Sequence, residues 1–154
     1  MAAPTAPVMN YQCKAYRNTG TYGTPTWVLF DNMGSVKIND ERGEVEIALR
    51  SGGLFEGFVA GRRKISIEWE MLYDPADASQ TAFRAAYDSE SQAGIDMAFM
   101  DQAIATAGSA GIRGTFVFTK CAEVVDDLGK PMMTSVKVAP RAGATNKPER
   151  FVAS

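Results

Sequence analysis

The chain has 154 residues, of which 45% are hydrophobic, and its 16 basic and 18 acidic residues give a formal net charge of −2. This length and composition fit one compact domain, and the near-neutral charge argues against a protein that clamps nucleic acid electrostatically. Because the sequence contains no histidine, a Ser-His-Asp or Cys-His catalytic arrangement is excluded.

Other familiar signals are also missing. No apolar run approaches the roughly 20 residues that cross a bilayer, and the start MAAPTAPVMNYQ lacks signal-peptide features, so we expect a cytosolic protein. The two cysteines, Cys13 and Cys121, form no CxxC pair; we expect both to be reduced, with Cys121 in the core. Phosphate-binding and calcium-binding loop motifs are absent. We therefore expect no metal, cofactor or catalytic residue.

The first 25 residues are rich in Pro, Thr, Gly and Asn and predict an arm or loop with little core of its own. Its tyrosines are candidates for contacts with a neighbouring subunit: Tyr11, Tyr16 and Tyr22. A loosely ordered terminus is the alternative interpretation.

From residue 26 the pattern becomes that of β-strands. TWVLF, SVKI and EVEIALR are predicted strands, separated by turns at DNMG and NDERG. In the third strand, alternate residues are predicted to face the core: Val45, Ile47 and Leu49.

The segment SGGLFEGFVAG, residues 51–61, combines four glycines with large apolar side chains. Aromatic groups on such a loop are costly to leave in water. We therefore expect the loop to bury its apolar residues in another copy of the chain: Leu54, Phe55, Phe58 and Val59.

A long strand is predicted over residues 62–73, where apolar and polar residues alternate. The core face should carry Ile65, Ile67, Trp69, Met71 and Tyr73. The opposite face should carry Arg62, Lys64, Ser66, Glu68 and Glu70.

The spacing of Glu68 and Glu70 also matches the acid and base of an inverting glycosidase. Such a pair needs one carboxyl in an apolar, desolvated pocket. Arg62 and Lys64 precede the pair on the same face and favour ionised carboxylates. The residues therefore favour a solvated sheet face over an active site.

After this strand, Asp74 is the predicted N-cap of a helix that runs from Pro75 or Ala76 to Tyr87. Its apolar side should be formed by Ala82, Phe83, Ala86 and Tyr87, and Gln80 and Arg84 should face away. Further strands are predicted at 95–100, 115–124 and 133–140.

Several antiparallel strands and one helix predict the α+β class, mainly β: an antiparallel β-sandwich or barrel with one flanking α-helix. The expected organisation is an N-terminal arm or loop at 1–25, a β-sandwich domain at 26–140 and a polar C-terminal tail at 141–154.

The order of these parts resembles the major tail tube proteins of long-tailed bacteriophages and, more distantly, the tube proteins of type VI secretion and related injection systems. The resemblance rests on the segments GSVKINDERGEVEIALR, RRKISIEWEMLYDPADASQTAFRAAYDSE, IDMAFMD and GIRGTFVFTKCAEV. The most specific part is the strand, DP turn, helix and strand of residues 62–100, and the resemblance covers nearly all of residues 11–140.

The resemblance implies a non-enzymatic structural protein that self-assembles into stacked hexameric rings, whose inner sheets line a channel for DNA ejection. It implies a place in the virion tail after assembly in the host cytoplasm. The implied partners are other copies of the chain, the tape measure, baseplate or tip and terminator proteins, and DNA in transit without specific binding; no membrane is implied.

The same resemblance implies roles for particular residues. Loop 51–61, the arm and the tail, with Phe151, are expected to reach adjacent subunits or rings. The polar face of the long strand is a candidate channel wall, formed by Arg62, Lys64, Glu68 and Glu70. Acidic groups there would keep DNA phosphates from adhering.

Two further hypotheses stay open. An injection-system tube that delivers effectors fits the same sequence equally well. A small-ligand-binding β-barrel is suggested by the many strands and the abundance of Met and aromatic residues.

Overall fold

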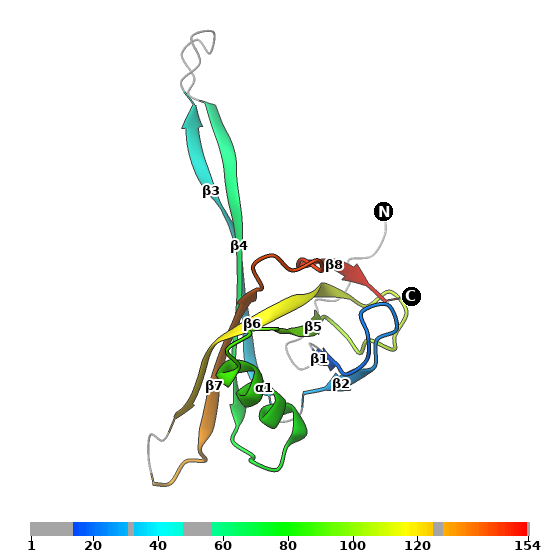
Figure 1. Cartoon of the computed structure of the whole chain (residues 1–154), viewed down its shortest axis with the longest axis vertical. Helices are drawn as coiled ribbons and strands as arrows, with labels where there is room; N and C mark the ends of the chain where they lie inside the picture. The colour runs from blue at the N-terminus through cyan, green and yellow to red at the C-terminus, as the bar shows by residue number, and fades with distance from the viewer. Residues whose placement is uncertain (1–13, 31–32, 48–56, 125–127, 154) are drawn as a thin grey trace, which may run out of the picture.

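A computed structural model describes residues 14–30, 33–47, 57–124 and 128–153 of the chain. In this part of the chain, eight strands form one antiparallel sheet and a single helix flanks it (Figure 1). The elements are β1 Lys14–Asn18, β2 Trp27–Leu29, β3 Met33–Ile47, β4 Gly57–Leu72, α1 Ala78–Asp88, β5 Ile95–Met100, β6 Ala110–Val124, β7 Met133–Pro140 and β8 Glu149–Val152. The predicted fold class is confirmed.

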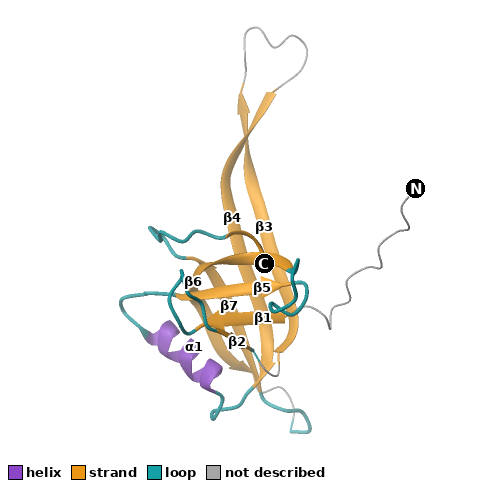
Figure 2. Cartoon of the chain, turned by 90° about the vertical axis from the view of Figure 1, so that its right-hand side faces the viewer, coloured by secondary structure: helices purple, strands orange, loops and turns teal. Residues whose placement is uncertain are grey.

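The strand order is β2-β1-β5-β6-β7-β4-β3, with β8 paired to the start of β6. In Figure 2 strands β1, β5 and β6 cross in front of β3 and β4, so the sheet folds back on itself. Contacts between the two parts support this arrangement, since the Phe99 ring on β5 lies 5.6 Å from the Trp69 ring on β4. The core lies between these layers, as in an orthogonal sheet packing.

Helix α1 closes one side of this core. Its Phe83 is buried, and the ring packs against Phe30, Trp69 and Phe118 at centroid distances of 4.8, 5.9 and 5.1 Å. Aromatic pairs at such separations add stabilisation beyond the area that they bury. The described helix is too short and polar to span a membrane.

The predicted alternation of the long strand is confirmed over most of its length. Ile65, Ile67, Trp69 and Met71 are buried, but Tyr73 lies past the end of β4 and is exposed. Strands β5 and β7 have the predicted bounds, and Cys121 is buried as expected.

The predicted turn at NDERG is wrong, because β3 continues through it from Met33 to Ile47. The partner strand β4 supplies a hydrogen-bonded ladder along this stretch and begins at Gly57 instead of residue 62. The pairing changes register between Arg42 and Glu44, where Gly43 faces Gly61. This bulge accommodates the turn-type residues within a strand.

The predicted start of the helix is also wrong. Asp77, not Asp74, caps α1 by accepting a hydrogen bond from the Ser79 amide at 3.0 Å. Asp74 instead accepts from the Ala76 amide in the preceding turn. Both aspartates suit such positions, and only the tertiary packing decides between them.

Of the two helix side chains predicted to face away, Gln80 is buried, whereas Arg84 stays 39% exposed while it contacts β6. The Gln80 amide donates to the Leu72 carbonyl at 2.6 Å and accepts from the Asp74 amide at 3.0 Å. Arg84 donates to the Cys121 carbonyl and pairs with Glu123 on β6. Tyr87, predicted on the apolar side, is exposed.

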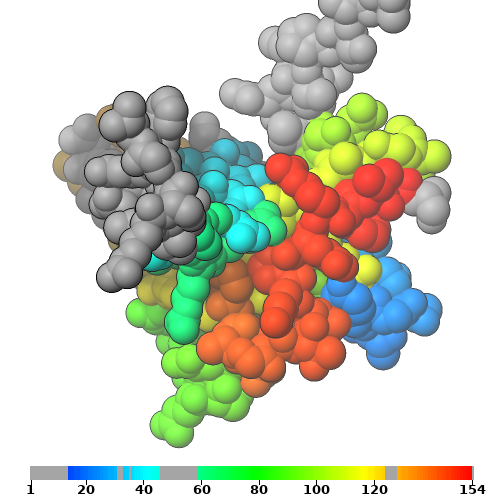
Figure 3. Space-filling view, turned by 90° about the horizontal axis from the view of Figure 1, so that it is seen from above, coloured from blue at the N-terminus to red at the C-terminus, as the bar shows by residue number. Residues whose placement is uncertain are grey.

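The chain ends contribute more to the sheet than expected. Strand β1 lies in the predicted N-terminal arm, and its Ala15 is buried beside β5. Strand β8 lies in the predicted polar tail. Seen from above, the C-terminal segment in red lies near the blue N-terminal strands (Figure 3). The β-domain therefore includes elements from both sides of residues 26–140.

Candidate functional site

Strands β3 and β4 extend far beyond the rest of the sheet (Figure 1). Strand β7 pairs with β4 only from Ile67 to Leu72. Above that point, residues 39–47 and 57–66 pair only with each other among the described residues, and we call them the projecting ribbon. Its two outer edges therefore present unpaired backbone groups, which are templates for pairing with another chain.

The projecting ribbon also carries exposed apolar side chains. Val45 and Val59 are a cross-strand pair, and they are 53% and 50% exposed. The prediction that Val45 faces the core is wrong for the single chain, because no second layer of described residues covers this part of the ribbon. Apolar pairs on a projecting element are typical of surfaces that another subunit covers.

An ion pair stiffens the ribbon. Arg63 donates from Nε to Oδ1 of Asp40 at 2.7 Å and from Nη2 to Oδ2 at 2.5 Å. These hydrogen bonds hold the pKa of the Asp40 carboxyl below its ordinary value. The contact is bidentate and joins the two strands diagonally, because Asp40 is directly opposite Ile65.

The second surface is the polar face of β4 and its neighbours, opposite the core. Glu68 is directly opposite Lys37 on β3 and Lys137 on β7. The Asn39 amide lies within 3.4 Å of Glu68 Oε1. Glu70 and Lys64 are exposed on the same face. The face thus mixes acidic and basic side chains along adjacent strands.

This face offers little support for an acid–base pair. Glu68 is half-buried and Glu70 exposed, and the groove around them is open. A glycosidase acid needs a desolvated pocket. In the described ranges, no three Cys, Asp or Glu side chains gather as a metal site requires.

The predicted contact residues fall into three groups. Tyr11, Leu54 and Phe55 lie outside the described residues, and Phe58 lies in β4 with its side chain undescribed. Val59 is exposed on the projecting ribbon, as are Arg62 and Lys64. The remaining three, Tyr16, Tyr22 and Phe151, make contacts within the chain.

Tyr22 and Phe151 lie beside a buried arginine, Arg113, which no sequence motif indicated. The Arg113 guanidinium lies 3.8 Å from the Tyr22 ring and 5.5 Å from the Phe151 ring. It also donates to Asp96 Oδ2 at 2.9 Å. Tyr16 is buried nearby, and its hydroxyl accepts from the Ile104 amide. These residues join the N-terminal strands to β8.

A hollow of about 370 Å³ lies between α1 and the strands β6 and β7. Its lining includes Phe83, Cys121, Thr134 and Val136. Burial raises the pKa of the Cys121 thiol above its ordinary value, partly offset by Arg84. The hollow lies beside the helix, whereas aromatic rings fill the space between the sheet layers.

No protein-family model matches the sequence, and no curated protein sequence matches it. Solved structures do share its fold. A chain in the tail of an empty gene transfer agent particle with C6 symmetry is 15% identical with a TM-score of 0.67, over 95% of this chain and 98% of that one. The tail tube of SPP1 is 15% identical with a TM-score of 0.68, over 95% of this chain and 81% of that one.

A third similar structure comes from the sheath–tube complex of PVC, an extracellular contractile injection system in its extended state. It is 10% identical with a TM-score of 0.65, over 95% of this chain and 92% of that one. At these identities the likeness establishes the fold. The chain has the fold found in phage tail tubes and contractile injection system tubes, which confirms the resemblance predicted from the sequence.

Proposed function

We propose that the chain is the repeating structural subunit of a tube, in which six copies join side by side into a ring, as the C6 symmetry of the similar gene transfer agent tail suggests, and the rings stack. The observation that carries the proposal is the projecting ribbon, whose two edges have no backbone partner among the described residues. A monomer seldom keeps such long open edges. Joined edges satisfy their backbone groups and cover Val45 and Val59.

In this proposal the polar face of β3, β4 and β7 is the channel wall, and the chain has no catalytic role. A conduit for a polyanion must let it slide without holding it, and Glu68 between Lys37 and Lys137 offsets their positive charge. The cargo is DNA passing through a virion tail, and the tape measure, the tip and the terminator are the expected partners at the tube's interior and ends.

A second candidate is a tube that carries effector proteins. The similarity to the contractile injection system structure supports an effector-carrying tube. This support is as strong as the support that the phage tail structures lend to a DNA conduit. Native particles purified from the producing cells distinguish the two, since one holds encapsidated DNA and the other holds protein cargo.

The direct test is negative-stain electron microscopy of the purified protein across a range of concentrations. We expect rings or tubes about 100 Å across, given protomers of ordinary compactness. A protein that stays monomeric at high concentration would contradict the proposal.

A matched variant isolates the ribbon. Replacing residues 42–63 by Asn-Gly joins the directly opposed Glu41 and Lys64 through a two-residue hairpin turn and keeps the rest of β3 and β4. We expect this variant to fold and remain monomeric. If it forms tubes as well as the full chain does, the projecting ribbon is not the assembly element.

A further inference from the structure

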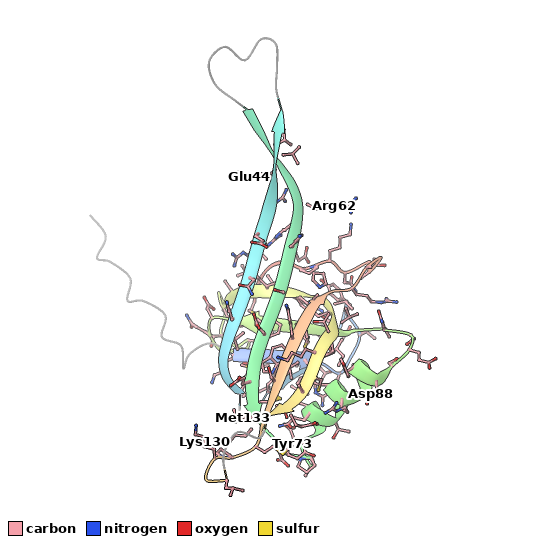
Figure 4. The ribbon with its side chains drawn as sticks, turned by 90° about the vertical axis from the view of Figure 1, so that its left-hand side faces the viewer. Glu44, Arg62, Tyr73, Asp88, Lys130 and Met133 are labelled. Atoms are coloured by element: carbon pink, nitrogen blue, oxygen red, sulfur yellow. The ribbon has the colours of Figure 1, made fainter. Side chains whose placement is uncertain are left out.

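The two strands of the projecting ribbon carry opposite charge. On β3, residues 39–47 contain four acidic residues and one basic residue. On β4, residues 57–66 contain three basic residues and no acidic one. Figure 4 labels Glu44 on β3 and Arg62 on β4 in this part of the molecule. One edge of the ribbon is therefore acidic and the other basic.

Only part of this charge is used within the chain. Asp40 and Arg63 form the ribbon's ion pair. Glu41 and Glu44 on β3, and Arg62 and Lys64 on β4, form no ion pair with any described residue. All four side chains are exposed. Glu41 is directly opposite Lys64, and the exposed Arg42 adds one basic group to β3. Even so, each edge keeps a net surplus of its own sign for a neighbour.

We propose that these charges direct assembly, so that the β3 edge of one copy pairs with the β4 edge of the next. The inference rests on the proposed function and specifies which edges meet. Copies related by rotation about an axis parallel to the ribbon all point the same way. The β3 strand of one copy then lies antiparallel to the β4 strand of its neighbour, which continues the alternation already present in the sheet.

The same charges disfavour the competing arrangement. A two-fold dimer through the ribbon would place β3 against β3, with Glu41 and Glu44 near the same residues of the second copy. Like charges opposite one another across strands are destabilising, whereas opposite charges stabilise the pair. The ribbon therefore selects a heterologous contact, which repeats in one direction and closes into a ring.

The apolar pair on the ribbon agrees with this geometry. Val45 is on β3 and Val59 is directly opposite on β4, on one face of the ribbon. When the β3 edge meets the next β4 edge, the exposed Val45 comes toward the neighbour's valine on the same face. In this arrangement the charges decide which two edges pair. Burial of the valines strengthens the contact between the copies but does not favour one pairing of edges over another.

Charge reversal on each edge tests the inference. One variant carries Glu41→Lys and Glu44→Lys, so both of its edges are basic. The other carries Arg62→Glu and Lys64→Glu, so both are acidic. We expect each variant alone to need a concentration about tenfold higher than the unchanged chain before it assembles. High salt should narrow the difference, because about 1 M salt shortens the Debye length to about 3 Å.

The decisive sample is an equimolar mixture of the two variants, since alternating copies again set a basic edge against an acidic edge. We expect the mixture to form rings or tubes at concentrations where neither variant does. The control is Asp88→Lys with Glu90→Lys, which makes the same charge change at the end of α1 and just beyond it. We expect it to assemble like the unchanged chain.

The outcomes separate this inference from the proposed function. If the unchanged chain assembles and both edge variants assemble equally well alone, the charge pairing is wrong and the tube stands. If the edge variants fail alone and also fail when mixed, pairing between opposite edges is wrong. If the unchanged chain never assembles, the proposed function fails and this inference fails with it.

Discussion

Arg113 on β6 donates to Asp96 on β5, with Nη2 2.9 Å from Oδ2, and both side chains are largely buried. The guanidinium also donates to the Tyr22 carbonyl at 2.7 Å and lies 4.8 Å from the Trp27 ring. A buried charge with these partners is satisfied only while all of them stay in place. The pair therefore links the N-terminal loop, the centre of the sheet and β8.

We expect Arg113→Met to lower the free energy of unfolding by about 3–5 kcal/mol, because it leaves the buried Asp96 carboxylate without its charged partner and with only the Asn18 amide as donor among the described residues. Urea unfolding followed by tryptophan fluorescence measures the loss. Arg63→Met is the matched control, since it breaks the exposed pair with Asp40 and should change stability little. Equal losses in the two variants would contradict the structural role of Arg113.

Gly111 is the next sensitive position, because β5 approaches its backbone closely. A Cβ atom there would lie 1.9 Å from the Phe99 carbonyl oxygen, so the paired strands β5 and β6 would have to move apart. We expect Gly111→Ala to cost about 3 kcal/mol or more in unfolding free energy. Thermal or urea unfolding tests this directly.

Gly129→Ala provides the comparison, since a Cβ at Gly129 has open space around it. We expect that substitution to change stability by less than about 0.5 kcal/mol. If Gly111→Ala were as mild, the close approach between β5 and β6 would be wrong.

The sequence predicted those elements whose signal is local. Ile65 to Met71 alternate so regularly that one strand face and its buried residues follow from the pattern alone. The bounds of β7 follow in the same way. The capping aspartate was misassigned because Asp74 and Asp77 have similar local chemistry.

Features that depend on distant partners were not predictable. The continuity of β3 through Asp40 and Gly43 depends on pairing with β4. Arg113 reaches the Tyr22 carbonyl across 91 positions of sequence, and nothing near GIRG indicates that contact. The opposite charges of the two ribbon edges were present in the sequence, but their meaning appears only once β3 and β4 are known to be paired.

Cys121 should react slowly in the folded protein. Burial raises the pKa of its thiol, so the thiolate that attacks alkylating reagents is scarce, and the residue is only 9% exposed although it lines the hollow beside α1. In a Cys13→Ser variant, we expect iodoacetamide at about pH 8 to modify Cys121 at least about tenfold faster in denaturing urea than in buffer. Similar rates in the two solutions would show that the thiol is open to solvent.

The same shift gives a pH dependence with a definite sign. The folded state keeps the thiol protonated above the pH at which the unfolded chain loses the proton, so the folded state binds more protons there. Stability should therefore fall as pH rises above about 8.5, the ordinary thiol value. Cys121→Ala is the control, because it should reduce the slope of stability against pH over this range.

Glu68 connects the structure to the proposed channel. It lies opposite both Lys37 and Lys137, so Glu68→Gln leaves two lysines on that face without the intervening carboxylate. If the face lines a conduit, we expect assembled variant tubes to retain short duplex DNA that unchanged tubes release, in a filter or pelleting assay. Retention should disappear as salt rises, because phosphate contacts of this kind release counterions.

Glu90→Gln removes the same charge from an exposed position after α1 and should leave DNA release unchanged. Equal retention by the two variants would show that Glu68 does not face the path of the DNA.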